Sequence, residues 1–249
     1  MNWHLIQSGF STGQFNMEFD YQLALNCKED DAYFRLYRWK PFCISIGANQ
    51  NFSDVNLIKA EEDGIDVVKR PTGGRAILHA EELTYSVIIP LSYSLTPKEI
   101  YYKTSIALIK GLSLYNPALS KAELEPSQPY FPSVVNSPTG LICFASTAKN
   151  EVKFHGRKLI GSAQRKMQNT VLQHGSILCG DFHKKLPDYL ALNQQQKENL
   201  KKELSEKTIE IESIVNKRVD YERLSECIII GFENEFKIDF IDTTIKSTI

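Results

Sequence analysis

This sequence of 249 residues contains few cysteines, almost no net charge and no long apolar run. Its five cysteines are far apart, and no two of them form a C-x-x-C pair. A zinc site with that spacing and a disulfide framework are therefore not expected. No apolar run approaches the roughly 18 residues of a transmembrane helix, and the first residues lack the basic and apolar regions of a secretory signal. We expect a cytoplasmic protein that makes no membrane contact.

The charge and the composition narrow the possible classes further. The net charge is −1, which argues against a nucleic-acid partner held by bulk electrostatics. Hydrophobic residues make up 42% of the chain and charged residues 24%, and such a composition can build a sizeable core. We therefore expect a globular protein that binds neither a metal ion nor nucleic acid.

Predicted helices and strands alternate along the chain. Apolar spacing predicts helices over residues 13–28, 55–63, 97–114 and 221–236, the first of them from Phe15, Phe19 and Leu23, which recur every four residues. A capping box at Thr96 and Glu99 marks the start of the third helix. Aromatic and branched residues predict strands over 32–37, 42–46, 83–90, 141–144 and 171–178, and hairpins over 66–79 and 151–160. This order predicts one compact α/β or α+β domain over residues 1–249, with a mixed β-sheet flanked by helices.

Residues 69–79, with the sequence KRPTGGRAILH, are the most informative segment of the chain. Two adjacent glycines separate two short apolar runs, cations flank the glycines, and His79 closes the segment. The local pattern is typical of a β-hairpin with a Gly-Gly turn. Glycine also lets a backbone approach a ligand closely, and nearby cations and amides can hold an anionic or carbonyl-bearing substrate. Both interpretations are compatible if the turn of the hairpin forms a wall of the binding site.

Cys143 is the candidate nucleophile. It ends a short apolar run before a small polar turn, and catalytic side chains are common where strands open into loops. Position alone favours a buried core cysteine. However, residues 149–168 contain six cations and a single acid, Glu151, and a cationic setting raises the thiolate fraction of a nearby thiol. The same charge would attract an acidic protein partner, unless these residues form only a solvated hairpin face. Cys179 is a second candidate nucleophile.

Two segments of the chain resemble a known superfamily. Residues 70–79 (RPTGGRAILH), followed by residues 82–86 (ELTYS), resemble the signature loop of the lipoate/biotin protein ligase superfamily. Residues 156–164 (GRKLIGSAQ) resemble its second motif, and Cys143 followed by Phe144 is similar to the cysteine site of its octanoyltransferase branch. The resemblance implies the catalytic fold of biotin and lipoate ligases, which is related to class II aminoacyl-tRNA synthetases. The proline that often follows Cys-Phe in these enzymes is missing, which leaves the shape of that loop open.

The resemblance also implies an activity. The expected enzyme is an octanoyltransferase of lipoate biosynthesis, an acyltransferase that moves octanoyl from acyl carrier protein to a lysine of a lipoyl-carrier protein. The acceptor would be the glycine-cleavage H protein or a lipoyl domain. Cys143 would carry the acyl group as a thioester and Lys158 would contact the acyl carbonyl, with no cofactor and no ATP. No accessory C-terminal domain is expected.

The resemblance further implies a set of substrate-binding residues. They are Arg70, Thr72, Gly73, Gly74, Arg75, His79, Gly161, Ser162 and Ala163. For His79 a satisfied structural role is an equal alternative, and His174 is expected to be structural. His155 and His183 are expected at the surface.

Two other functions stay open. An ATP-dependent lipoate or biotin ligase would form an acyl-adenylate at the same loop and would not need Cys143. Such ligases are less similar to this chain, because they have an Arg-Asn-Asp-like segment in place of the cysteine and commonly carry an extra domain. A non-catalytic module would bind acidic carrier proteins without transferring any acyl group.

Overall fold

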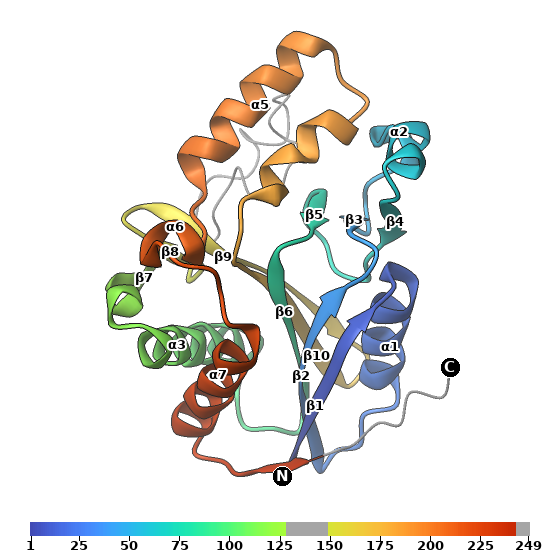
Figure 1. Ribbon diagram of the computed structural model, residues 1–249. Helices are drawn as coiled ribbons and strands as arrows, with labels where there is room; N and C mark the ends of the chain where they lie inside the picture. Colours follow the sequence, from blue (N-terminus) through green and yellow to red (C-terminus); the bar gives the residue numbers. More distant parts are fainter. Residues whose placement is uncertain (128–148, 243–249) are drawn as a thin grey trace.

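Two β-sheets form the centre of the molecule, as the computed structural model in Figure 1 shows for residues 1–127 and 149–242. The strands are β1 (Asn2–Ser11), β2 (Asp31–Trp39), β3 (Cys43–Ile46), β4 (Asp66–Lys69), β5 (Ile77–His79), β6 (Glu82–Pro90), β7 (Ala122–Leu124), β8 (Val152–Phe154), β9 (Arg157–Met167), β10 (Thr170–Leu178) and β11 (Phe240–Asp242). The larger sheet has the order β11-β1-β2-β6-β10-β9-β8-β7 and the smaller sheet the order β4-β3-β5. Both sheets mix parallel and antiparallel pairs, which confirms the predicted mixed sheet.

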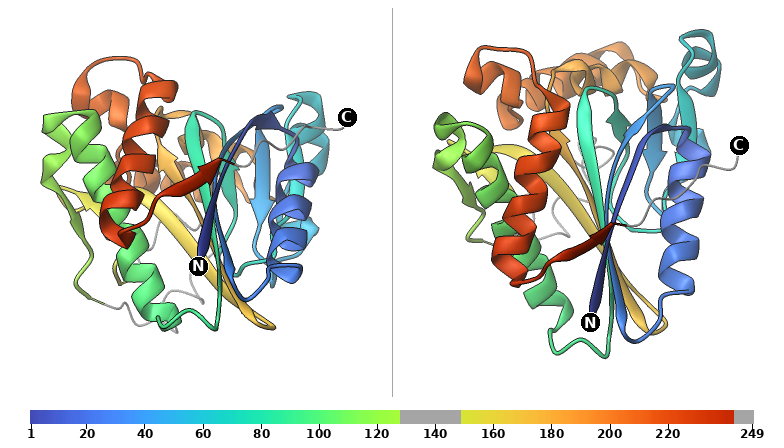
Figure 2. Two further views of the ribbon diagram at one scale, coloured as in Figure 1. Left: turned by 90° about the horizontal axis from the view of Figure 1, so that it is seen from below. Right: turned by 60° about the horizontal axis from the view of Figure 1, so that its bottom comes forward.

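Helices cover both faces of the larger sheet. They are α1 (Gly13–Leu25), α2 (Leu57–Glu62), α3 (Pro97–Tyr115), α5 (Gln194–Lys207), α6 (Ile211–Val215) and α7 (Tyr221–Phe236), with the 3-10 turns η1 (Phe52–Asp54), η2 (Pro117–Lys121) and η5 (Phe182–Tyr189). Figures 1 and 2 show α3 and α7 on one face and α1 on the other. Because β6 lies between β2 and β10 under this double cover, all of its residues are buried. None of the helices in the described ranges is long and apolar enough to cross a membrane.

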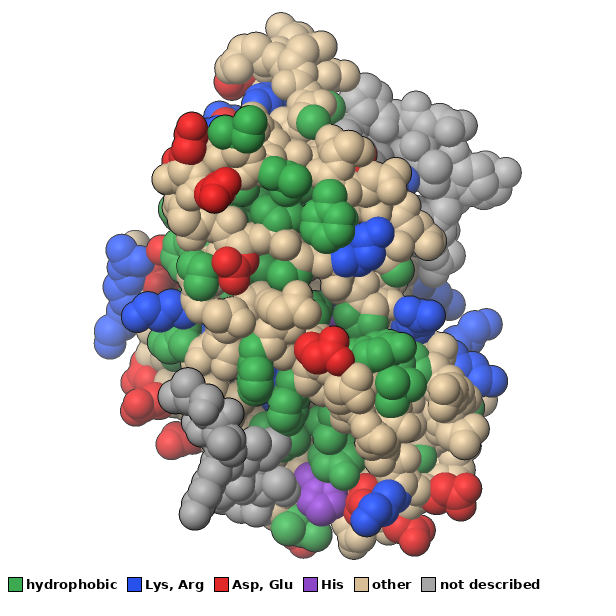
Figure 3. All heavy atoms as spheres, turned by 90° about the vertical axis from the view of Figure 1, so that its right-hand side faces the viewer, with side chains coloured by type: hydrophobic (Ala, Val, Ile, Leu, Met, Phe, Trp, Pro, Cys, Tyr) green, Lys and Arg blue, Asp and Glu red, His purple; other side chains and the backbone are tan. Residues whose placement is uncertain are grey.

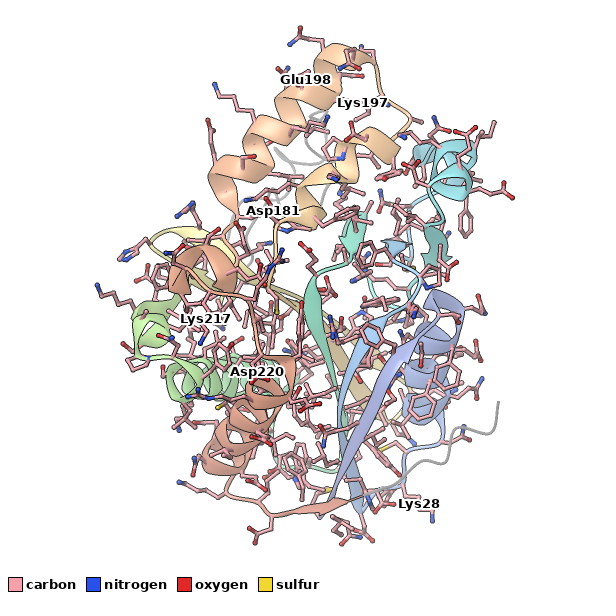
Figure 4. The ribbon with its side chains drawn as sticks, viewed as in Figure 1. Lys28, Asp181, Lys197, Glu198, Lys217 and Asp220 are labelled. Carbon is pink, nitrogen blue, oxygen red and sulfur yellow. The ribbon has the colours of Figure 1, made fainter. Side chains whose placement is uncertain are left out.

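The predicted helices and strands agree well with the structure in the described residues. The capping box at the start of α3 is formed, since Thr96 Oγ1 accepts from the amide of Glu99 at 3.3 Å and Glu99 Oε2 accepts from the amide of Thr96 at 2.7 Å. The last helix, α7, begins at Tyr221 behind the N-cap Asp220, which Figure 4 labels. The strand pattern does not predict β1, because its buried and exposed positions do not alternate regularly. The predicted strand 141–144 lies outside the described residues.

The segment 66–79 is not the predicted hairpin. Strand β3 lies between β4 and β5, pairing parallel with β4 and antiparallel with β5. The Gly-Gly loop therefore crosses over the end of β3 instead of joining two adjacent strands. Gly47, at the end of β3, lies so close to the Gly74 carbonyl that a side chain there would collide with it. This close approach, together with the hydrogen bonds of Arg70 described below, explains why the loop arches over β3.

Helix α1 turns a partly polar face to the sheet. The row of Phe15, Phe19 and Leu23 that predicts the helix is not its buried side, because Phe15 is 43% exposed. The buried positions include Asn16, Met17 and Asp20. Phe15 and Phe19 stack on each other with 5.5 Å between ring centroids, and Figure 3 shows apolar side chains on this side of the molecule. The polar inner face of α1 faces the candidate site.

His183 is buried, so its predicted position at the surface is wrong, whereas His155 is exposed as expected. Its Nδ1 lies 3.2 Å from the Gly180 carbonyl, and its Nε2 lies 2.9 Å from Thr208 Oγ1. These contacts join η5 to the residues that follow α5. Burial lowers the pKa of His183 to about 4, because the charged ring would lose its hydration.

We expect Gly231→Ala to destabilise the protein. A side chain at Gly231 would lie 2.6 Å from the Gly111 amide nitrogen, because α7 and α3 approach at these glycines. In an open helix the change would stabilise by about 1 kcal/mol, but forced separation of two packed helices should cost about 1–3 kcal/mol instead. Urea unfolding measures the difference. Asn234→Ala, at an exposed position of the same helix, is the control, and an unchanged or raised midpoint for Gly231→Ala would contradict the expectation.

We expect His183 to make the folded protein less stable in mild acid. Its pKa falls from 6.5 to about 4 on folding, so between these values the unfolded chain binds a proton that the folded chain does not. Its contribution to stability is complete above pH 6.5 and is lost as the pH falls toward 4. Urea midpoints across this interval should decline less steeply for His183→Gln than for the wild type. His155→Asn, in an exposed turn, is the control, and identical slopes for all three proteins would disprove this assignment.

Candidate functional site

A largely buried cavity lies against the larger sheet, and its wall is mostly apolar. The lining residues are Met17, Tyr37, Trp39, Arg70, Ile77, His79, Thr84, Gly161, Ser162, Ala163, His174, Gly175 and Ser176. Within this set Ser162 and Ala163 are half-buried and the others are buried, so the described part of the wall opens along β9.

Arg70 holds the loop between β4 and β5 in its shape. Its guanidinium donates to the carbonyls of Ser45 at 3.0 Å, Gly73 at 2.9 Å and Arg75 at 2.7 Å. A planar group with five fixed donors suits such a set of carbonyls. Gly74 has φ +96°, a conformation that favours glycine. Arg70, only 3% exposed, therefore shapes the cavity wall by fixing the backbone of residues 70–75.

His79 sits in the cavity wall within a buried network. Its Nδ1 lies 2.8 Å from Glu82 Oε1, and its ring stacks on Trp39 with 4.1 Å between centroids. The hydroxyls of Thr84 and Ser176 donate to the same carboxylate oxygen at 2.6 and 2.8 Å. Burial alone would raise the pKa of Glu82, but the attraction of His79 and these hydrogen bonds hold it below its ordinary value. His79 is thus both part of the cavity and a hydrogen-bonded structural residue.

A buried ion pair stands behind the cavity, between α1 and the sheet. Arg35 Nη1 lies 2.8 Å from Asp20 Oδ1, and neither side chain is exposed. Tyr37 and Ser86 donate their hydroxyls to the two oxygens of Asp20 at 3.1 and 2.9 Å. Burial opposes the charge of Asp20, yet Arg35 and His174 together outweigh it and lower the pKa of the carboxyl. The pair satisfies the polar inner face of α1.

His174 connects this ion pair to the signature loop. Its Nε2 lies 2.6 Å from Thr72 Oγ1, and its Nδ1 lies 3.9 Å from Asp20 Oδ2. Burial lowers the pKa of His174 despite the nearby carboxylate. A neutral ring can accept from one side and donate from the other. His174 lines the cavity and fixes Thr72, and its structural role stays a prediction.

Lys158 is buried in an ion pair on the hairpin of β8 and β9. Its Nζ lies 3.0 Å from Glu151 Oε2, and the two side chains are 1% and 3% exposed. The other oxygen of Glu151 accepts from the amide of Ser162 at 3.3 Å. Ser162 Oγ in turn lies 2.7 Å from the hydroxyl of Tyr85, whose pKa burial raises to about 12. One carboxylate therefore joins Lys158 to the cavity wall.

The structure brings together a large part of the predicted site. Arg70, His79, Gly161, Ser162 and Ala163 line one cavity, although the two segments are far apart in the sequence. The other predicted binding residues lie in the loop that Arg70 and His174 hold, and they are Thr72, Gly73, Gly74 and Arg75. Lys158 is connected to the cavity wall through the Glu151 carboxylate. The binding roles of these residues stay predictions.

Cys143 and Cys179 are the two predicted candidate nucleophiles. Cys143 lies outside the described residues. Cys179 and Cys43 are buried, and burial raises the pKa of each thiol well above its ordinary value, which argues against either as a nucleophile. In residues 1–127 and 149–242 no group of three or more His, Cys, Asp or Glu side chains could hold a metal ion.

Sequence reasoning missed the acids that organise the site. Asp20, Glu82 and Glu151 are each more than nine-tenths buried, and each pairs with a cation or histidine that is also buried. A usable signal was present, because Glu82 begins a strand that is otherwise suited to full burial and Arg35 lies in an aromatic strand. Buried charges are rare unless they are paired, so such positions indicate partners elsewhere in the chain.

Comparisons with known proteins agree with this geometry. Residues 12–233 match the family model of the lipoyl protein ligase A/B catalytic domain. Octanoyltransferase LipM of Lysinibacillus sphaericus is 32% identical over 98% of this chain and 90% of that protein, and octanoyltransferase LipM of Bacillus subtilis is 31% identical over 95% and 87%.

Two solved structures share the fold. A putative lipoate protein ligase from T. acidophilum with bound lipoic acid has a TM-score of 0.76 at 19% identity, covering 99% of this chain and 91% of that one. Lipoate-protein ligase A bound with ATP has a TM-score of 0.76 at 19% identity, covering 99% and 90%. These neighbours confirm the predicted ligase-type catalytic fold.

We expect Asp20→Asn to destabilise the protein strongly. The substitution keeps the size of the side chain but leaves the Arg35 charge buried without its counter-charge, and breaking a buried pair in this way costs about 3–5 kcal/mol. Glu206→Gln is the control, because its ion pair with Lys202 is 64% and 78% exposed, and it should change stability by less than about 1 kcal/mol. Chemical unfolding of both variants tests the difference, and equal small effects would show that the Asp20 charge is dispensable.

Proposed function

We propose that this acyltransferase, which belongs to the lipoyl protein ligase A/B catalytic-domain family, is an octanoyltransferase of lipoate biosynthesis. It would move octanoyl from acyl carrier protein to a lysine of a lipoyl-carrier protein, such as the glycine-cleavage H protein or a lipoyl domain. Cys143 would carry the octanoyl group as a thioester. The proposed enzyme is a cytoplasmic single domain that needs no cofactor.

One observation carries this proposal. The signature loop around Arg70 and the second motif around Ser162 meet at one apolar, largely buried cavity. Each buried methylene of an acyl chain gains about 0.8 kcal/mol, so burial of the octanoyl tail against this apolar wall would anchor the substrate. Relatives that match nearly the whole chain are named octanoyltransferases, which supports octanoyl as that acyl group.

The proposed reaction has two halves. The Cys143 thiolate attacks the carbonyl carbon of the octanoyl thioester on the carrier, the carbon–sulfur bond to the phosphopantetheine arm breaks, and that thiolate leaves. Because one thioester replaces another, this half is nearly balanced and needs no ATP. The neutral amine of the acceptor lysine then attacks the acyl-enzyme, and an amide forms as the carbon–sulfur bond to Cys143 breaks. The proton that the amine loses passes to water or to the released Cys143 sulfur. Conversion of a thioester to an amide is downhill and drives the transfer.

Lys158 would stabilise the oxygen that becomes negative in both halves. A well-placed donor to a developing oxyanion contributes about 3 kcal/mol. Its ion pair with Glu151 in a buried setting supports a cationic donor role, since water does not compete there. The link from Glu151 to Ser162 places this pair beside the wall of the cavity.

The rival function is an ATP-dependent ligase. One structural neighbour is described as lipoate-protein ligase A bound with ATP, but at 19% identity it supports only the fold. A further neighbour comes from a structural analysis of an archaeal lipoylation system with its E2 lipoyl domain, which fits a lipoyl domain as the acceptor. The cysteine at position 143 and the relatives above 30% identity favour the transferase.

Intact mass spectrometry tests the thioester route. After mixing with octanoyl-acyl carrier protein without ATP, the wild type should gain one octanoyl group, and peptide mapping should locate it on Cys143. Cys143→Ala should show no adduct and should lose at least about a thousandfold of its transfer rate, as expected when a nucleophile is removed.

Cys227→Ser is the matched control, because Cys227 is a half-buried thiol on α7 away from the cavity. It should retain both the adduct and the activity. Transfer that survives Cys143→Ala, or that requires ATP, would replace the transferase with the ligase. Binding of carrier protein without any transfer would instead indicate the non-catalytic module.

A further inference from the structure

Glu151 holds Lys158 at an unusual place in the fold. Both side chains are almost fully buried, with 3.0 Å between Lys158 Nζ and Glu151 Oε2. Their neighbours on the two strands, Val152, Leu159 and Ile160, belong to the apolar core. A charged pair in such surroundings loses its hydration, and the attraction between the charges does little more than offset that loss. An apolar pair of similar size would stabilise the hairpin as well or better, so stability alone does not account for these two charges.

The hairpin is built to bring the two charges together. The chain turns at His155 and Gly156, both with positive φ, and the register shifts between Val152 and Lys153 where β8 pairs with β9. Such a bulge changes the direction of the side chains beside it. It lies immediately after Glu151.

Both partners are also fixed by contacts outside their own pair. The Lys158 carbonyl accepts from the amide of Ile209 at 3.0 Å. The second oxygen of Glu151 accepts from the amide of Ser162 at 3.3 Å, and Ser162 lines the cavity. The carboxylate therefore sets the position of the ammonium relative to the cavity wall, because one of its oxygens contacts Lys158 and the other contacts Ser162.

We propose that Glu151 is a positioning residue, which aligns the Lys158 ammonium with the cavity wall at Ser162 so that it meets the acyl carbonyl oxygen as negative charge develops. This inference rests on the role of Lys158 in the proposed function. A preorganised donor costs no reorganisation at the moment of reaction, and small displacements of a catalytic group have large effects on rate. Glu151 itself touches neither the acyl group nor the nucleophile in this role.

A second ion pair on the same hairpin provides a matched comparison. Lys153 on β8 is the register partner of Lys158 on β9, and its ammonium pairs with Glu125. That pair is more exposed, at 19% and 10% of the two side chains, and Glu125 does not line the cavity. Glu125 follows β7, and its amide donates to the Glu151 carbonyl at 2.9 Å. Glu125→Gln therefore removes a charge that pairs with the same hairpin, while the backbone contact to Glu151 and the Glu151–Lys158 pair keep their groups.

The test is a double-mutant cycle on the first half of the reaction. Single-turnover acyl transfer from octanoyl-acyl carrier protein is followed by intact mass for wild type, Glu151→Gln, Lys158→Met, the double variant and Glu125→Gln. At saturating octanoyl-acyl carrier protein, Glu151→Gln should lower the rate roughly 10- to 100-fold. Lys158→Met, which removes the ammonium itself, should lower it roughly 100- to 1,000-fold. For Glu151→Gln, the concentration of octanoyl-acyl carrier protein that gives half the maximal rate should change little, because positioning acts on the transition state.

The double variant decides the mechanism. If Glu151 acts through Lys158, the double variant should be within roughly threefold of Lys158→Met, since the two losses are not additive. Multiplied losses would show that Glu151 acts independently, and a wild-type rate for Glu151→Gln would also overturn the proposal. Glu125→Gln should stay within roughly threefold of the wild type, and an equal loss there would indicate a general effect on the hairpin.

Failure of the octanoyltransferase assignment has a different signature. A wild type that forms no adduct from octanoyl-acyl carrier protein, but octanoylates a lipoyl domain from octanoate and ATP, would reject the thioester route. The same five proteins assayed with octanoate and ATP would then show whether the two losses are additive. Thermal unfolding of each protein distinguishes a folded variant with a low transfer rate from a variant that is unfolded. A wild type that is inactive under both conditions would reject both proposals.

Discussion

Charges that are buried in an apolar sheet must find partners, and this requirement organises the whole site. Asp20 meets Arg35 behind the cavity, Glu82 meets His79 in its wall, and Glu151 meets Lys158 beside it. Every one of these pairs joins residues that are buried. An unpaired charge at any of these positions would cost several kcal/mol. The Asp20–Arg35 pair joins α1 to β2, whereas the other two pairs fix the turn from β5 to β6 and the hairpin of β8 and β9.

The shape of the cavity depends on contacts that hold its lining segments in place. Its floor is the larger sheet, and its other lining residues are Met17 of α1, Arg70 in the loop after β4, and Ile77 and His79 of β5. Arg70 fixes the backbone of the loop through three carbonyls, and His174 holds the same loop through Thr72. The polar inner face of α1 is held through Asp20. The result is an apolar space bounded by polar groups that are paired with one another, which suits an uncharged acyl chain.

In the proposed function, the same arrangement separates binding from chemistry. The apolar wall can hold a medium acyl chain by burial alone, without any charged contact. The cation that would meet the acyl carbonyl stands apart on the hairpin of β8 and β9 and is connected to the wall by one carboxylate. In this design the chain anchors the substrate, and Lys158 with Cys143 would act on its carbonyl end.

The sequence by itself determined the local structure and the family. Caps, apolar spacing and turn residues predicted α3, α7 and the hairpin at Lys158, since each depends on residues a few positions apart. The two motifs identified the family and named five of the residues that line the cavity. Tertiary structure alone decided the insertion of β3 between β4 and β5, the burial of His183, the inward polar face of α1 and the partner of each buried charge. These features depend on contacts between distant segments, and the free energy of such contacts comes from burial and pairing that no local pattern encodes.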